Sequence, residues 1–162
     1  MNRTAFISTR DPKNTRAIPG ALFHFLATGE QTAGDHSLIE IQVLAGNEPP
    51  AHTHEHEDEM YFILEGRMRF EVGERTIDAT PGSYVYLPRG VQHSFKVNSD
   101  RAHVLMWLTP AGLEQWFWDN SAPVPDMLPM PLPAGPPPPE LVQHFVSSLA
   151  EYGVHMAPVP VN

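Results

Sequence analysis

The stretch from Gly46 to Gly66, GNEPPAHTHEHEDEMYFILEG, constrains the fold more than any other part of the sequence. His52 and His54 are separated by one residue, and Glu59 follows five residues later. Residues i and i+2 of a β-strand project from the same face, so the two imidazoles would stand about 7 Å apart along it. Imidazole nitrogen and carboxylate oxygen are ligands of divalent transition metals, and the sequence has no cysteine to compete with them. The stretch therefore predicts a strand that presents a metal site.

A fourth ligand lies in a second stretch, GSYVYLPRGVQH, which ends at His93. Pro88 and Gly90 form a turn there, and this turn directs the following strand back toward the first pair of histidines. Among divalent transition metals, Fe, Ni, Mn, Co and Zn all accept this ligand set, so the sequence does not identify the metal. The predicted metal ligands are His52, His54, Glu59 and His93.

These two stretches resemble the two motifs of the cupin superfamily, G-x5-H-x-H-x4-E-x6-G and G-x5-P-x-G-x2-H-x3-N. The match to the first motif is complete, and its five fixed residues would arise by chance about 1–2 times in 10,000 in a chain of this composition. In the second motif Val97 stands where the family has Asn, with Asn98 one place later. The resemblance implies a jelly-roll β-barrel of the single-domain (monocupin) type.

Longer segments are similar to bacterial single-domain cupins related to quercetin 2,3-dioxygenase, which cleaves the flavonol ring. They read LATGEQTAGDHSLIEIQV, HEDEMYFILEGRMRF, LPRGVQHSFKV and TPAGLEQWF, and they cover about residues 22–118. In that family the residue matching Glu59 binds the metal and accepts the proton of the flavonol hydroxyl, after which dioxygen attacks the ring and carbon monoxide leaves. The resemblance implies a metal-dependent dioxygenase with Glu59 as its catalytic residue and an aromatic small molecule as its substrate.

Two other classes of function fit the same ligands. An isomerase or lyase acting on a sugar or keto acid would use them too, but it would add Lys or Arg inside the barrel to hold a carboxylate or phosphate. Arg67, Arg69 and Lys96 are out of phase with the ligands, which argues against this class. The third class is a cupin that binds a small molecule without catalysis. We rank the dioxygenase first.

Four residues are candidates for the lining of a substrate pocket. Tyr61 and Ile63 follow the glutamate ligand on its strand, and Phe95 and Val97 follow the last histidine, each in the two-residue phase of the ligands. They therefore point where the ligands point, and an apolar lining is compatible with an aromatic substrate. The alternative is that each belongs to the plain core of the barrel.

The remaining histidines of this region are left out of the site. His56 stands between Glu55 and Glu57, which is typical of a solvated loop. His24 and His36 each lie alone on a predicted strand, where a histidine is usually a packed or surface residue.

Short β-strands separated by turns dominate the first two thirds of the chain. Residues 21–27 and 36–45 are rich in β-favouring residues, residues 60–72 resemble a hairpin around Gly66, and residues 102–109 close the β region. Seven or eight strands at this spacing predict an all-β sandwich or barrel. The resemblance selects the cupin jelly-roll barrel.

A length of 162 residues fits one domain. Residues 5–7 form an apolar patch in the first segment that can add an edge strand. The predicted parts are an N-terminal arm at 1–20, the barrel at 21–118, and at 119–162 a proline-rich strap followed by a C-terminal helix packed on the barrel.

After Pro110 the pattern turns helical, with the aromatic residues Trp116 and Phe117 on one face. This helix would cap one barrel mouth or form a dimer contact. Residues 122–139 hold nine of the eighteen prolines and predict an extended strap, and residues 140–152 predict an amphipathic helix. The apolar N-terminal patch and the two helices together exceed what one small barrel covers, so we expect a homodimer.

The formal charge of −9, with no block of Lys or Arg, excludes the electrostatic pattern typical of proteins that bind nucleic acid or anionic membranes. The absence of cysteine suits a reducing compartment. The sequence contains neither a signal peptide nor an apolar run of 18 residues. These observations predict a soluble, cytoplasmic protein.

Overall fold

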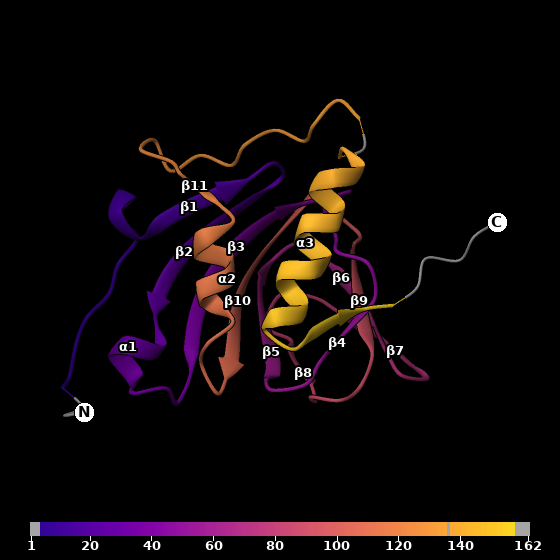
Figure 1. Cartoon of the computed structure of the whole chain (residues 1–162), viewed down its shortest axis with the longest axis horizontal. Coiled ribbons are helices and arrows are strands. Elements are labelled where there is room, and N and C mark those ends of the chain that lie inside the picture. Colours follow the sequence, from indigo (N-terminus) through magenta and orange to yellow (C-terminus); the bar gives the residue numbers. More distant parts are fainter. Residues whose placement is uncertain (1–3, 136, 158–162) are drawn as a thin grey trace.

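The computed structural model describes residues 4–135 and 137–157 and consists mainly of two antiparallel β-sheets (Figure 1). The order is β11-β1-β2-β3-β10-β5-β8 in the larger sheet and β12-β4-β9-β6-β7 in the smaller one. The predicted all-β jelly-roll barrel is confirmed. The strands of the larger sheet are β11 (Ala122–Pro123), β1 (Thr15–Ile18), β2 (Ala21–Ala27), β3 (Ser37–Leu44), β10 (Arg101–Thr109), β5 (Asp58–Glu65) and β8 (Tyr84–Leu87). Those of the smaller sheet are β12 (Val154–Met156), β4 (His52–His54), β9 (His93–Val97), β6 (Met68–Val72) and β7 (Arg75–Ala79).

Alternation of buried and less buried residues, clearest along β5, β6 and β10, builds the core between the two sheets. On β3, Ile39 and Val43 are buried, and on β6 Met68 and Phe70 are buried while Arg69 between them is exposed. Because side chains of a strand alternate between its faces, one face of each sheet supplies the apolar interior. Most buried apolar residues of both sheets join in one hydrophobic cluster, and Ala17, Leu22 and Val124 form a second, smaller cluster.

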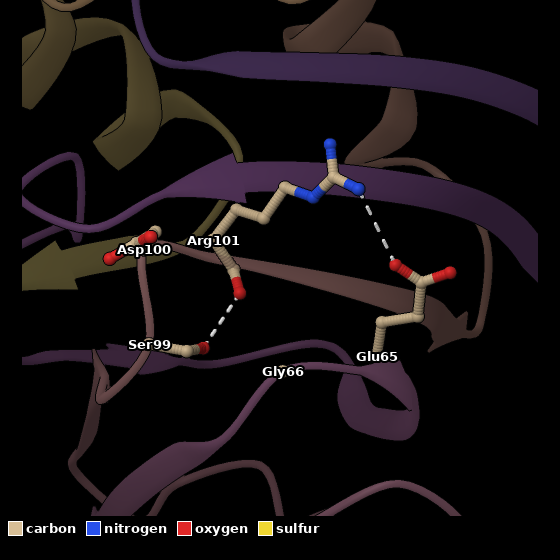
Figure 2. Close-up of a pocket in the computed structure, with 5 residues that line it drawn as sticks. All are labelled: Glu65, Gly66, Ser99, Asp100 and Arg101. Carbon is tan, nitrogen blue, oxygen red and sulfur yellow. Dashed lines mark hydrogen bonds and ion pairs between the residues drawn. The ribbon is translucent and has the colours of Figure 1, made fainter.

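The turn at Gly66 does not form the predicted hairpin. The strand before it, β5, lies in the larger sheet between β10 and β8, whereas β6 after it lies in the smaller sheet between β9 and β7. Gly66 has φ of 84°, and a Cβ there would lie 2.4 Å from the carbonyl oxygen of Arg101, so the crossing needs glycine. Figure 2 shows Ser99 bonded to the same carbonyl and the Arg101–Glu65 ion pair (3.6 Å) beside this crossing.

The N-terminal segment differs from the predicted arm. Its apolar patch pairs with no strand, so Phe6 and Ile7 are left 49% and 90% exposed. Instead β1, at residues 15–18, pairs with β2, so the larger sheet begins before residue 21. A short 3-10 helix, η1 (Pro12–Asn14), precedes β1, and α1 (Gly29–Thr32) lies within the predicted turn between β2 and β3. Residues 1–3 of the arm lie outside the described residues.

The C-terminal part follows the predicted order of helix, strap and helix. Helix α2 (Glu114–Asp119) lies in the predicted aromatic segment, and α3 (Pro139–Glu151) follows the strap, which runs along one end of the barrel (Figure 1). After α3 the chain turns at Gly153 and forms β12, which pairs with the histidine strand β4. The C-terminal segment thus supplies an edge strand to the smaller sheet, and residues 158–162 lie outside the described part.

Candidate metal centre

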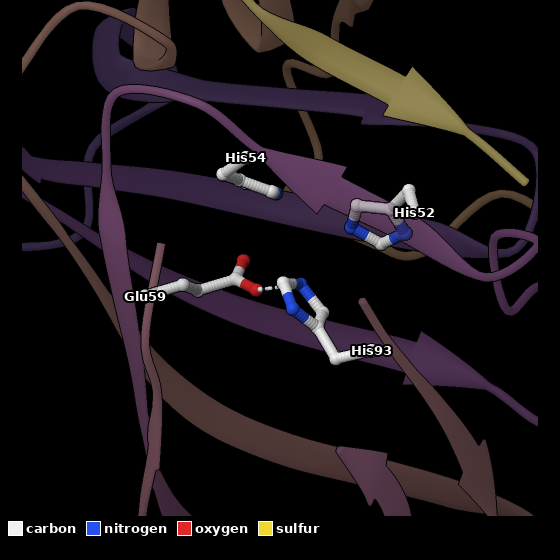
Figure 3. Close-up of side chains that lie close together, drawn as sticks. All are labelled: His52, His54, Glu59 and His93. Carbon is white, nitrogen blue, oxygen red and sulfur yellow. Dashed lines mark ion pairs between the residues drawn. The ribbon is translucent and has the colours of Figure 1, made fainter. Parts of the chain in front are cut away.

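The four predicted ligands come from three strands in two sheets. His52 and His54 lie on β4, and His93 lies on the neighbouring strand β9, directly opposite His52 in the register. Glu59 comes from β5 of the facing sheet. Figure 3 shows the four side chains pointing toward one another across the barrel interior. The fold therefore brings together residues that are up to 41 positions apart, between His52 and His93.

The geometry of this group fits one metal ion. One ligand atom of each residue lies within 4.8 Å of the others, and the ring centroids of the histidines are 4.6–5.2 Å apart. Two ligand atoms on one ion stand at most about twice the 2.0–2.2 Å bond length apart, so a small contraction suffices. All four residues are buried, with exposed fractions between 2% and 7%. Buried polar groups packed this closely are typical of a metal site.

In His52 and His93, the contact of Nδ1 with a backbone carbonyl leaves Nε2 available to bind a metal. Nδ1 of His52 lies 2.9 Å from the carbonyl oxygen of Pro50, and Nδ1 of His93 lies 3.0 Å from that of Val91. Nε2 of His93 is buried and has no hydrogen-bond partner among the described residues, although it lies 3.3 Å from a carboxylate oxygen of Glu59. A buried nitrogen without a partner requires an explanation, and a coordinated cation supplies one.

Glu59 is ionised in this environment. Burial alone would raise the pKa of its carboxyl, but the contact with His93 and the electrostatic interaction with the histidines around it lower that pKa to about 2. Its Oε1 accepts a hydrogen bond of 3.0 Å from the hydroxyl of Tyr61. Burial and the charge of Glu59 raise the pKa of Tyr61 well above its usual value, so this hydroxyl stays protonated and donates. Tyr61 thereby orients the carboxylate.

Two of the histidines differ in their electrostatic surroundings. Burial lowers the pKa of His52, which favours the neutral ring that a metal needs. Burial acts in the same direction on His54, but the acidic neighbours Glu57 and Glu59 outweigh it, and its pKa is raised. Of the two carboxylates, Glu57 is not part of the four-residue group, yet it lies 3.6 Å from Nδ1 of His54.

The four candidate pocket residues fall into two pairs. Tyr61 and Phe95 line the cavity in front of the metal ligands. Ile63 and Val97 do not line it; they are 0% and 7% exposed and pack in the core. All four point into the barrel, as the two-residue phase requires. Ile63 and Val97 lie farther along their strands, where side chains from both sheets fill the interior.

The cavity itself has a volume of about 1130 Å³ and reaches from His52, His54 and Glu59 to the strap. Helix α2 contributes Trp116 and Phe117, and α3 contributes Leu141 and Phe145. The described residues that line it include no Lys or Arg. The aromatic face of α2 thus faces the cavity, and part of the apolar face of α3 also lines it.

The other histidines considered in the sequence lie away from the four-residue group. His24 is buried, with Nδ1 2.7 Å from the hydroxyl oxygen of Thr15, and belongs to the packing of β1 on β2. His36 is half-buried, and His56 is exposed, as expected for a loop residue. What the sequence interpretation missed is Glu57, which belongs to the same acidic run but is buried.

Comparison with known proteins places the chain in a family. Residues 39–109 match the family model described as Cupin domain. An uncharacterized protein of Streptomyces coelicolor is 34% identical over 94 residues, which are 58% of this chain and 84% of that protein. A solved structure of an RmlC-like cupin from Shewanella frigidimarina has a TM-score of 0.58 at 16% identity and covers 71% of this chain and 99% of that one. The chain belongs to the cupin superfamily.

A second relative of this cupin is the quercetin 2,3-dioxygenase of Bacillus subtilis. The two are 25% identical over 103 residues, which are 63% of this chain but only 31% of the dioxygenase. The matched region of this cupin thus corresponds to about a third of that protein's length. The buried group of three histidines and one glutamate is compatible with a metal site in a cupin domain.

Proposed function

We propose that this cupin is a metal-dependent dioxygenase of the quercetinase type, which cleaves a flavonol or a similar enolisable aromatic compound. His52, His54, Glu59 and His93 would hold one divalent transition metal. When bound, the metal would supply positive charge that favours the ionised form of a substrate hydroxyl and open positions for substrate and dioxygen. The distant likeness to quercetin 2,3-dioxygenase supports this class of reaction.

The observation that carries the proposal is the apolar cavity in front of the ligands. At about 1130 Å³ it exceeds the usual range of pockets for small molecules and can take a multi-ring substrate. Aromatic side chains, among them Tyr61, Phe95 and Phe117, line it. Flat aromatic ligands stack on or meet the edges of such rings. The cavity therefore favours an aromatic substrate over a sugar.

The same cavity argues against an isomerase or lyase acting on a phosphorylated sugar or keto acid. Such a substrate needs a Lys or Arg to neutralise its charge, and none lines the cavity among the described residues. Arg69 is exposed on the outer face of its sheet, where it pairs with Asp78 at 2.7 Å. Apart from histidines, the charged side chains among the described residues that line the cavity are acidic: Glu48, Glu59 and Asp119.

Glu59 provides the acid–base step of the proposed reaction. With Oε1 held by Tyr61, its Oε2 is the oxygen that accepts the proton of the substrate hydroxyl. The ionised substrate then reacts with one molecule of dioxygen, and the products are one ring-opened ester and one molecule of carbon monoxide. The apolar walls from α2 and α3 keep bulk water away from this step.

The test feeds quercetin to protein stripped of metal and reloaded separately with Fe, Ni, Co, Mn or Zn. We expect uptake of dioxygen and release of carbon monoxide in equal amounts with at least one of these metals, and neither with the metal-free protein. Carbon monoxide is the discriminating product, because an isomerase or a binding protein cannot form it.

If neither dioxygen uptake nor carbon monoxide release occurs with any of the metals, the proposal is overturned. In that case tight binding of quercetin, followed by fluorescence quenching of the tryptophans, would identify a cupin that only binds the compound. No binding would point to a different class of substrate.

A further inference from the structure

The three histidines of the metal group differ in what holds their second ring nitrogen. In His52 and His93, Nδ1 lies 2.9 Å and 3.0 Å from a backbone carbonyl oxygen two residues earlier in the chain. Nδ1 of His54 is buried and has no hydrogen-bond partner among the described residues. A histidine that ligates a metal usually donates its other N–H to a fixed acceptor, which sets its tautomer and ring orientation. For His54 this acceptor has to come from a side chain.

The carboxylate of Glu57 is the group in that position. Its Oε2 lies 3.6 Å from Nδ1 of His54, and this oxygen is itself buried without a hydrogen-bond partner in the described part of the chain. The side chains of Glu57 and His54 are only 6% and 3% exposed, so water does not separate them freely. A buried carboxylate oxygen left unpaired is costly. A ring nitrogen that can donate and a carboxylate oxygen that can accept, both buried and unpaired, thus face each other just beyond hydrogen-bond distance.

The loop between β4 and β5 holds Glu57 inward. Its neighbours Glu55 and His56 are exposed, whereas Glu57 is buried. The backbone N–H of Glu55 donates to the carbonyl oxygen of Gly153, and the N–H of Gly90 donates to that of His54, each at 2.8 Å. Turns on both flanks, at Gly90 and Gly153, therefore fix the loop, and a contraction of less than 1 Å would bring the two side chains into a hydrogen bond.

Resting on the proposed metal-dependent function, we propose that Glu57 is a positioning residue, which accepts the Nδ1–H of His54 and so turns Nε2 of that ring toward the metal. This carboxylate makes His54 the only one of the three ring ligands with a charged partner on its far side, within the described residues. A carboxylate partner raises the donor strength of the imidazole, and a backbone carbonyl does so less. The metal is thereby bound more tightly through His54.

The test measures the affinity of the metal-free protein for Co²⁺ by competition with a chelator. We expect Glu57→Ala to weaken Co²⁺ binding about 10- to 100-fold, the usual effect of losing such a partner. Glu57→Gln should recover part of the loss, because its amide oxygen still accepts a hydrogen bond. The matched control is Glu55→Gln, two residues earlier on the exposed side of the loop, which should stay within about 2-fold of the unchanged protein.

A second readout separates positioning from a general structural role. In the Zn²⁺-loaded protein, the ring N–H protons of all three ligating histidines should be visible by NMR, and Glu57→Ala should lose the one from His54 through exchange with water. Equal Co²⁺ affinity in both Glu57 variants and in the unchanged protein, with all three N–H signals retained, would overturn the role of Glu57. If the unchanged protein binds no Co²⁺ at all, the proposed function itself fails.

Discussion

In the proposed function Glu59 has two roles, as a metal ligand and as a proton acceptor, and a single substitution can separate them. Its position on β5 brings it to the histidines from the opposite sheet, and Tyr61 two residues later on the same strand fixes one of its oxygens. The low pKa of about 2 means that the carboxylate form is present throughout the neutral range.

We predict that Glu59→Gln keeps most of the metal but lowers turnover of the flavonol about 100-fold or more. The amide retains an oxygen near the ion and nearly the same volume, but it cannot take up a proton at neutral pH. Metal content is measured by elemental analysis and turnover by dioxygen uptake. Glu65→Gln, on the exposed end of the same strand, is the control and should leave both unchanged. Full activity of Glu59→Gln with metal bound would contradict the role.

At the scale of single residues, the ligand group could be predicted because its information is local. The two-residue phase of His52 and His54 holds on any strand, and the turn at Pro88 and Gly90 pointed to His93, which the family motif also contains. The burial of Glu57 could not be predicted, because an acidic run has the same composition whether its loop faces water or a histidine. The hydrogen bond from Tyr61 to Glu59 depends on side-chain rotamers, which the alternation pattern does not specify.

Among the larger elements, helix α3 has two ends with different environments. Leu149, near its C-terminus, is 7% exposed and belongs to the main core. Leu141 and Val142, near its N-terminus, line the cavity and remain 38% and 43% exposed. One end of α3 therefore anchors the helix, whereas the other end presents an apolar surface to whatever occupies the cavity.

This division predicts that two substitutions in the same helix affect different quantities, one the stability and the other ligand binding. Leu149→Ala should lower the free energy of unfolding by about 2–5 kcal/mol, as truncation of a buried leucine does. Leu141→Ser should change it by less than about 1 kcal/mol but weaken quercetin binding about 3- to 10-fold, because a ligand in the cavity loses an apolar contact. Urea unfolding and fluorescence titration measure the two quantities. Equal losses of stability from the two substitutions would contradict the division; binding is compared only for Leu141→Ser, because Leu149 also lines the cavity.

The positions of most strands and helices could be predicted from the local sequence, but the strands with which each one pairs could not. The strands at 21–27, 37–44 and 101–109 lie within one residue of the expected ranges, because aromatic or β-branched residues mark them. The hairpin at 60–72 was wrong, since the pattern around Gly66 describes two strands and a turn but not the sheet that each strand joins. The two-residue and three-residue strands β11, β4 and β12 are defined by tertiary pairing, and β11 and β12 had no signal of their own.

At the scale of the whole molecule, the expected homodimer stays a prediction, and its contact surface has to be reconsidered. The aromatic face of α2 lines the cavity, which removes it as a free contact surface. Exposed large side chains remain at Phe6 and Ile7 and, on the edge strand β8, at Tyr84 and Tyr86, which are 61% and 49% exposed. Light scattering at micromolar concentration should give about 36 kDa, twice the chain mass of 18.1 kDa. A mass near 18 kDa would reject the dimer.

The cytoplasmic location likewise stays a prediction from composition. In the described part of the chain, none of the helices is long and apolar enough to cross a lipid bilayer. Fractionation of cells that express the protein at its natural level would decide the compartment.

The pairing of β4 with β12 has a consequence for the time at which the histidine strand is completed during synthesis. His54 lies opposite Val154, which the ribosome adds 100 positions later. At about 5–20 residues per second, that interval lasts about 5–20 s. Until it ends, one edge of the histidine strand is open, and an open edge can pair with another nascent chain. We therefore expect stable metal loading only after nearly all of the described chain has left the ribosome.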